Sequence, residues 1–157
     1  MEIELRVSTD ADIPFVRNAH HAAYRDVVIR QWGRWDEELQ DEFFLRGWQD
    51  SPTDIIVLDG VDSGYTGVIA RDTEVVVHKL VVHPDHQGRG IGSQFLRGVL
   101  ADAAERDVPV RLRTCIENHR ARSFYAGLGF REVGRTETHI LMEWRQPPLP
   151  EQTGIGP

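Results

Sequence analysis

The sequence predicts an α/β fold of three layers, with a mixed central sheet and helices on both of its faces. Segments with alternating or continuous apolar residues, typical of strands, are interleaved with segments whose apolar residues recur at helical spacing. The expected order of elements is β-α-α-β-β-β-α-β-α-β-β. Helices alternate with strands only in the second half of the chain, which indicates a mixed rather than a wholly parallel sheet.

Composition and length favour one globular domain. The chain has 157 residues, of which 40% are hydrophobic and 27% are charged, as is ordinary for globular proteins. This length is enough to bury a sizeable core. We expect a single domain over residues 1–146. Residues 147–157 are rich in proline and glycine, and we expect them to form a flexible tail.

The first quarter of the chain predicts one strand and two helices. Residues 2–7 alternate apolar and charged side chains, which indicates a half-buried strand. A capping-box pattern at Thr9 predicts a helix that continues to about residue 28. Acidic residues from Asp36 onward favour a second helix start, because carboxylates stabilise the N-terminal turn. Gly47 is the expected end of that helix.

Three strands are expected next, over residues 54–58, 65–71 and 74–82. The segments between them contain the aspartate, serine and glycine residues typical of turns. Residues 62–64 are one such expected turn.

The second half predicts two helices and three strands. The expected elements are a helix over residues 90–106, a strand over 110–115, a helix over 121–128, and strands at 132–133 and 138–144. Asn118 is a suitable N-cap for the second of these helices, and Gly129 is a suitable stop. Gly134 is expected to form the turn between the last two strands.

A glycine-rich corner follows the strand at 74–82. That strand ends near Pro84, and Gln87, Gly90 and Gly92 then give the spacing Q-x-x-G-x-G at the start of a helix. Glycines allow the backbone to approach a ligand closely. The amides of residues 88–93 would be unpaired at the positive end of the helix dipole, which suits a pyrophosphate.

A second motif lies downstream. Residues 118–130 fit the pattern N-x-x-A-x-x-x-Y-x-x-x-G-F, and the glycine corner is preceded by V-V-x-P. Together these motifs resemble those of the GNAT N-acetyltransferase superfamily, in which the first is the acetyl-CoA-binding signature. The resemblance covers roughly residues 3–145 and implies the GNAT fold, with acetyl-CoA as donor and direct acetyl transfer to a primary amine. The acceptor is unidentified, and a small molecule is favoured over a protein N-terminus.

The resemblance also assigns residues to acetyl-CoA binding. These are Leu80, Val81, Val82, Gln87, Gly88, Arg89, Gly90, Ile91, Gly92, Ser93, Asn118 and Tyr125. Backbone groups of the strand would pair with the pantetheine arm, and the Val82 amide would polarise the thioester carbonyl. Tyr125 would be the acid near the sulfur, because a phenol with a pKa near 10 is a reasonable donor to a thiolate.

The general base is open at this point. Some relatives carry a glutamate where this chain has Arg113, which cannot act as a base. His78 and Glu74 are the alternatives, since strand alternation would give them the parity of Leu80. A structural role for His78 stays open as well. Cys115 is expected to be a packed thiol, since direct transfer needs no acyl-enzyme.

Three residues are candidates for acceptor binding. Trp35 and Asp36 belong to a W-D-E-x-x-Q-x-x-F pattern that resembles small uncharacterised bacterial members, and an aromatic wall with acids would suit an amine. The alternative is helix packing with a capping Asp36. Arg113 shares a strand face with Arg111, where the pair could bind a carboxylate or remain solvated.

Other classes of function fit less well. The net charge of −7 and the absence of a basic block disfavour nucleic-acid binding. No apolar run or signal segment indicates a membrane or secretion, and the single cysteine fits a reducing cytoplasm. No metal is expected, because no carboxylate–histidine set completes a site at His83 and His86. Nucleotide-binding motifs are missing. A non-catalytic acyl-CoA-binding or interaction module is the alternative function, and a homodimer is compatible with the resemblance.

Overall fold

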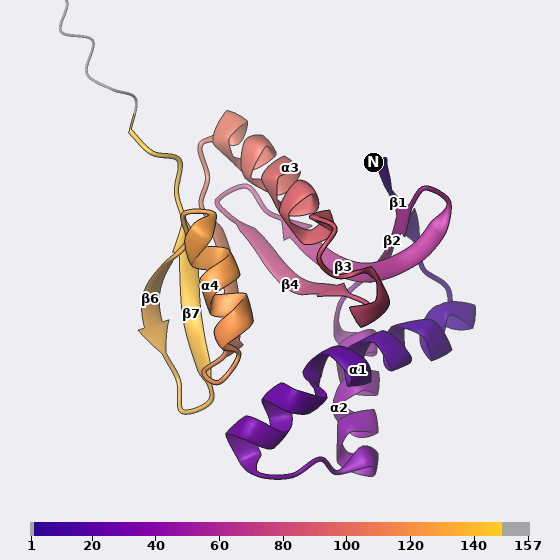
Figure 1. Cartoon of the computed structure of the whole chain (residues 1–157). Helices are drawn as coiled ribbons and strands as arrows, with labels where there is room; N and C mark the ends of the chain where they lie inside the picture. Colours follow the sequence, from indigo (N-terminus) through magenta and orange to yellow (C-terminus); the bar gives the residue numbers. More distant parts are fainter. Residues whose placement is uncertain (1, 149–157) are drawn as a thin grey trace, which may run out of the picture.

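The computed structural model describes residues 2–148 and shows a mixed seven-stranded sheet with helices on both faces (Figure 1). The predicted fold class is therefore confirmed. Most of the predicted tail, from residue 149 onward, lies outside the described residues. Among the residues that are described, no helix is long and apolar enough to cross a membrane.

The elements follow the predicted order. The strands are β1 (Ile3–Val7), β2 (Asp54–Leu58), β3 (Val61–Ala70), β4 (Val75–Val82), β5 (Val110–Cys115), β6 (Arg131–Arg135) and β7 (His139–Trp144). The α-helices are α1 (Ile13–Trp32), α2 (Glu37–Asp50), α3 (Ile91–Arg106) and α4 (His119–Gly127). Short 3-10 turns, η1 (Asp10–Asp12) and η2 (Pro84–His86), precede α1 and the glycine corner.

The sheet is split along its middle. Its strand order is β1-β2-β3-β4-β5-β7-β6, and β4 and β5 are its one parallel pair. These two strands pair only at Val75 with Val110 and at Val76 with Arg111. Beyond that point their facing edges have no ladder partner in the described chain. Because the two parallel strands pair only at their N-terminal ends, their C-terminal halves diverge and leave a gap between them.

A β-bulge in β4 changes which side chains face which helices. Lys79 pairs with Gly67 and Val77 with Val68, so His78 between them has no partner. Val77 and Leu80 both pack with the core under α3 and α4. In a regular strand, residues three apart would point to opposite faces. The prediction that Glu74 and Leu80 share a face is therefore wrong, because the extra residue at the bulge reverses the alternation.

Two main cores lie on opposite faces of the sheet. On one face, Leu96 and Leu100 of α3 and Tyr125 of α4 pack over β4, β5 and β7. On the other, Val16 and Ala19 of α1 meet α2 and the central strands. Figure 1 shows the same division, with α1 and α2 lying away from α3 and α4.

Several predicted boundaries are wrong. Helix α1 continues to Trp32 and ends at Gly33, whose φ of 86° suits a left-handed helix cap. Helix α2 continues through Gly47 to Asp50, since a helical glycine costs only about 1 kcal/mol. Strand β6 passes through Gly134, so the turn to β7 lies at residues 136–138.

Gly64 belongs to β3 and not to the predicted turn. A Cβ on this residue would lie 2.3 Å from the carbonyl oxygen of Val81 in β4. The glycine is therefore required by the close approach of two backbones, a tertiary feature that turn statistics do not reveal.

Candidate active site

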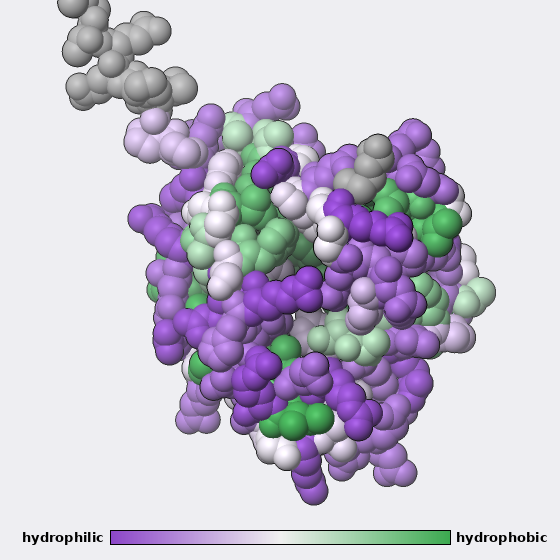
Figure 2. All heavy atoms as spheres, viewed as in Figure 1, coloured by the Kyte–Doolittle hydropathy of each residue, from purple (hydrophilic) through white to green (hydrophobic). Residues whose placement is uncertain are grey.

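A cavity of about 1380 Å³ begins in the gap between β4 and β5 and extends to α1 and α2. The glycine corner and α4 close one end of it, and the helices α1 and α2 close the other. Figure 2 shows this face of the molecule hollowed near its centre, with hydrophilic side chains beside the opening. The split sheet thus places residues from four strands, all four α-helices and the turn η2 of the described chain around one space.

The residues predicted to bind acetyl-CoA surround this cavity, with one exception. Those that line it are Leu80, Val81, Val82, Gln87, Gly88, Gly90, Ile91, Gly92, Ser93, Asn118 and Tyr125. Arg89 is exposed and lies outside the lining. The two sequence motifs therefore meet in space, while their role in binding stays a prediction.

The glycine corner presents free backbone donors to the cavity. Gly88 and Gly90 have φ values of 81° and 79°, a conformation that other residues adopt only with strain. Helix α3 begins there, and its first backbone bond runs from the Gln94 nitrogen to the Gly90 oxygen at 2.9 Å. The amides of residues 91–93 therefore have no helical partner, and the helix dipole adds positive potential.

Side chains next to the corner add further polar groups. Gln87 donates to the Val82 carbonyl at 3.0 Å and accepts from Arg120 at 2.7 Å, which ties β4 to α4. Arg120 lines the cavity and brings a cation close to the corner. His86 Nδ1 is buried without a hydrogen-bond partner in the described chain. Arg120 was not found from the sequence, since its position in α4 carries no recognisable motif.

Tyr125 lines the cavity from α4. Asn118 begins this helix by accepting a bond from the Ala121 amide at 3.2 Å, which confirms the predicted cap. The Tyr125 ring packs against Phe130, with ring centroids 5.6 Å apart. Burial raises the pKa of Tyr125 to about 12, so the phenol is protonated at neutral pH.

Tyr24 of α1 reaches the same region from the opposite side. Burial raises its pKa, and the nearby ionisable groups of Tyr125 and Cys115 raise it further. Two phenols from different helices therefore flank the centre of the cavity. The helical periodicity of α1 marked this face as core, and it gave no sign that Tyr24 would meet the second motif.

Cys115 and His139 also line the cavity, with sulfur and Nε2 3.8 Å apart. Burial raises the pKa of the thiol, and burial lowers the pKa of His139. Both shifts favour the neutral forms over a thiolate–imidazolium pair. The arrangement agrees with the prediction that Cys115 is a packed thiol.

The two predicted bases are placed differently. Glu74 lies outside the cavity, where it accepts from Arg111 at 2.7 Å and pairs with Arg71 at 3.5 Å. Because Glu74 does not reach the cavity, it is not placed to accept a proton from an acceptor bound there. His78 does line the cavity, and its side chain at the bulge is exposed. Partial burial and the neighbouring cations lower its pKa.

A third candidate base, His20 of α1, was missed by the sequence analysis. It lines the cavity one helical turn before Tyr24, with ring centroids 5.0 Å apart. His20 Nδ1 is 2.9 Å from Nδ1 of His21, and His21 Nε2 is 2.7 Å from Asp41 of α2. Burial and the neighbouring His21 lower the pKa of His20 to about 4.

The predicted acceptor residues are only partly in place. Asp36 and Arg113 line the cavity, and Asp36 also caps α2 by accepting from the Leu39 amide at 3.2 Å. Trp35 does not line it, because its indole donates to Glu37 at 2.6 Å and its ring packs on His21. The apolar wall at this end consists instead of Trp32, Leu39 and Phe43, all partly exposed.

Comparisons with known proteins agree with the motifs. The model of the acetyltransferase (GNAT) family matches residues 14–130. An uncharacterised N-acetyltransferase of Methanocaldococcus jannaschii is 28% identical over 109 residues, covering 66% of this chain and 47% of that protein. The N-alpha-acetyltransferase RimI of Mycobacterium tuberculosis is 39% identical over 75 residues, covering 45% of this chain and 46% of that protein. The chain spans about half the length of these curated relatives.

A solved structure shares the whole fold. The PaiA N-acetyltransferase of Thermoplasma acidophilum, crystallised in complex with coenzyme A, matches with a TM-score of 0.70 at 18% identity. The match covers 93% of this chain and 100% of that chain. At this identity the likeness concerns the fold alone.

Proposed function

The chain belongs to the GNAT acetyltransferase family, and on this basis we propose that it transfers an acetyl group directly from acetyl-CoA to a primary amine. The observation that carries the proposal is one continuous cavity, which joins the free amides at the start of α3 to the Tyr125 phenol. An anion site and a proton donor are thus connected by an open strand edge, as a long phosphorylated thioester requires.

The chemistry of the donor end fits coenzyme A. The free amides of residues 91–93 and the Arg120 guanidinium are suited to a pyrophosphate, as helix N-termini and cations generally are. The buried Nδ1 of His86 lacks a partner within the described chain and could be satisfied by a ligand here. Gly88 and Gly90 have open space where a Cβ would stand, so a ligand can come close to their backbone.

The edge of β4 offers main-chain groups to the rest of the donor. The His83 amide donates to Ser63 of β3 at 2.8 Å. In an antiparallel pair, successive residues point their backbone groups to opposite sides, so the Val82 amide points away from β3 and into the gap. This amide supports the proposed roles of pairing with the pantetheine arm and polarising the thioester carbonyl.

Tyr125 is the proposed acid. When the amine nitrogen attacks the thioester carbon, the carbon–sulfur bond breaks and the departing thiolate takes a proton. A buried phenol with a pKa of about 12 stays protonated at neutral pH, so its O–H is available to the departing sulfur as a hydrogen-bond and proton donor. Direct transfer requires no acyl-enzyme, in line with the neutral Cys115.

The acceptor end favours a small amine with an apolar part. Trp32, Leu39 and Phe43 expose apolar surface at the cavity, and Asp36 adds a carboxylate that attracts an ammonium group. Arylalkylamines combine these two features. We therefore favour a small molecule of this kind over a protein N-terminus.

Release of coenzyme A from acetyl-CoA in the presence of an amine tests the proposal. The panel contains 2-phenylethylamine, spermidine, an amino-acid amide and a short peptide, with acetyl-CoA binding measured by calorimetry. We expect micromolar acetyl-CoA binding and fastest turnover with 2-phenylethylamine. Binding without turnover of any panel amine would favour the non-catalytic acyl-CoA-binding module, which the presence of Arg113 in place of a glutamate supports. Failure to bind acetyl-CoA would contradict both functions.

A further inference from the structure

We propose that His20 is the general base of the acetyl transfer and that it passes the acceptor's proton to His21, which Asp41 holds in place. This inference rests on the proposed function, because it names the group that deprotonates the amine. His20 and His21 are adjacent on α1, while Asp41 comes from α2. Of these three residues, His20 is the one that lines the cavity.

The hydrogen bonds determine which nitrogen of His20 is free. Asp41 can only accept, so the 2.7 Å contact places a proton on His21 Nε2. Nδ1 of a neutral His21 is then an acceptor. Since the 2.9 Å contact between the two Nδ1 atoms needs one donor, His20 Nδ1 carries the proton. His20 Nε2 is left with an unshared electron pair.

The free nitrogen is not sealed inside the protein. His20 Nε2 has no hydrogen-bond partner among residues 2–148. Over the same residues, the one sealed side-chain nitrogen or oxygen without a partner is His86 Nδ1, so His20 Nε2 keeps exposed surface, and the residue lines the cavity. Tyr24, which lies beside His20, connects this position to Tyr125 and the proposed thioester site.

The proton moves without leaving a charge on His20. An ammonium acceptor gives its proton to His20 Nε2 and keeps the electron pair that attacks the thioester carbon. At the same time the Nδ1 proton of His20 passes to Nδ1 of His21. His20 is again neutral, in accordance with its lowered pKa of about 4, and His21 becomes an imidazolium.

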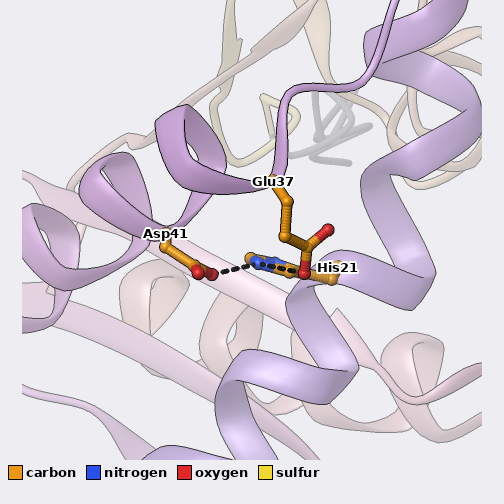
Figure 3. Close-up of side chains that lie close together, drawn as sticks. All are labelled: His21, Glu37 and Asp41. Atoms are coloured by element: carbon orange, nitrogen blue, oxygen red, sulfur yellow. Dashed lines mark hydrogen bonds and ion pairs between the residues drawn. The ribbon is translucent and has the colours of Figure 1, made fainter.

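Carboxylates stabilise that imidazolium. His21 Nε2 lies 2.7 Å from Asp41 and 3.9 Å from Glu37. Figure 3 shows the three side chains, with His21 lying between the two carboxylates. The His21 side chain is only 11% exposed and both of its nitrogens are bonded, so the relay resets in reverse. After the product leaves, His21 Nδ1 returns its proton to His20 Nδ1 and His20 Nε2 releases its own proton to water, which restores the starting tautomers. The groups that act on His20 are thus His21 and Tyr24 on α1, and Asp41 on α2.

A metal site is the competing explanation for this cluster. One ligand atom from each of His21, Glu37 and Asp41 lies within 4.8 Å of the others. Arg17, however, donates to Asp41 at 2.7 and 3.0 Å and to Glu37 at 2.9 Å. A guanidinium bound to both carboxylates uses their electron pairs and repels a second cation, so the cluster serves to orient His21.

His78 is less suited to the role than His20. Its side chain is exposed, and Arg71, Lys79 and Arg113 place positive charge around it. These cations oppose the approach of an ammonium acceptor and the gain of a proton. His20 instead contacts His21, which is bonded to the Asp41 carboxylate. This negative charge favours both the approach of the ammonium group and the gain of its proton.

The rate of 2-phenylethylamine acetylation as a function of pH tests the proposal. At pH 7, His20→Gln should lower kcat/KM at least about 100-fold without changing acetyl-CoA affinity, the usual scale for a lost general base. The deficit should shrink as the pH rises toward the amine pKa of about 10.4, because free amine then needs no base. His119→Gln, which replaces an exposed histidine outside the cavity, should stay within about twofold of wild type.

Asp41→Asn tests His21 as a positioning partner. Loss of the carboxylate should lower kcat about tenfold and move the acidic limb of the pH–rate profile, while KM for the amine changes less than twofold. If Asp41 had only a structural role, Asp41→Asn would leave the acidic limb of the pH–rate profile unchanged. Added imidazole should partly restore His20→Gln and should leave Tyr125→Phe unchanged.

Imidazole nitrogen NMR of the wild-type protein tests the relay independently of turnover. The expected tautomers at pH 7 are Nδ1–H for His20 and Nε2–H for His21. Three results would overturn the relay. The first is the opposite pair of tautomers, and the second is a fall in kcat/KM in His78→Gln with none in His20→Gln. The third is a fall in kcat/KM in His20→Gln that does not change with pH. Added Zn²⁺ that shifts the His21 resonances at micromolar concentration would overturn it in favour of a metal site. If wild type acetylates no amine, the proposed function fails, whatever the tautomers are.

Discussion

The two ends of the cavity are constructed in different ways. The proposed donor end consists largely of main-chain groups, namely the edge of β4 and the free amides of α3, with Tyr125 added by α4. The acceptor end consists of side chains from α1 and α2, among them His20, Tyr24 and Phe43. The donor end is therefore encoded in two short contiguous segments, and the acceptor end in the packing of two helices.

This difference has a consequence for substitution. Main-chain groups persist when side chains change, provided that the glycines which shape the backbone are kept. Side-chain positions can change one at a time without disturbing the sheet. One chain can thus keep a fixed donor site and vary its acceptor site, and the following substitutions test each end separately.

The largest effect is expected at Gly64, where β3 supports the strand that both ends share. Gly64→Ala would place a Cβ 2.3 Å from the Val81 oxygen, and neither backbone can yield without breaking the ladder. We expect a loss of about 3 kcal/mol in the free energy of unfolding, measured in urea. Gly98→Ala, at an open position in α3, should be neutral or stabilising by up to about 1 kcal/mol. Equal stability of the two variants would contradict the close approach.

Tyr125→Phe separates chemistry from donor binding. The phenylalanine keeps the packing against Phe130 and removes the acid, so kcat should fall about 100-fold, or about 2.7 kcal/mol. The affinity for acetyl-CoA in calorimetry should stay within about twofold. An unchanged kcat would remove Tyr125 from the proposed chemistry and leave the α4 motif a purely structural one.

A pH dependence of stability is expected at the acceptor end. The folded pKa of His20 is about 4, below its usual value near 6.5, so the unfolded chain binds the proton more readily. Stability due to neutral His20 is present above pH 6.5 and is lost as the pH falls toward 4. Between pH 7 and pH 5, wild type should lose about 2 kcal/mol more than His20→Gln in urea unfolding. Parallel losses would show that His20 is readily protonated in the fold.

The smallest effect is expected at the glycine corner. Gly90→Ala adds a Cβ into open space, so its cost is the strain of a left-handed backbone, about 1 kcal/mol. Relaxation of that strain should turn the free amides and weaken acetyl-CoA binding about fivefold. Gly127→Ala, in α4 with an ordinary helical conformation, should bind as wild type does. Equal affinity of both variants would contradict a main-chain donor site.

The sequence by itself determined the fold class and the local backbone geometry of the proposed donor end. Local spacing is sufficient for these features, because capping by Asn118, the left-handed turns at Gly88 and Gly90, and the helical repeat of α3 are all short-range. Boundaries were wrong where distant contacts outweighed local preference, as at Gly64. The alternation along β4 was wrong because a bulge at His78 leaves no mark in the sequence.

The tertiary structure alone decided which side chains meet at the proposed acceptor end. His20 and Asp41 lie on different helices, α1 and α2. Only the packing of α1 on α2 brings the pair of histidines to the carboxylate. The same packing removed Trp35 from the cavity and placed Trp32 there. Side-chain sites formed between elements depend on how those elements pack, and helical periodicity records only which face is buried.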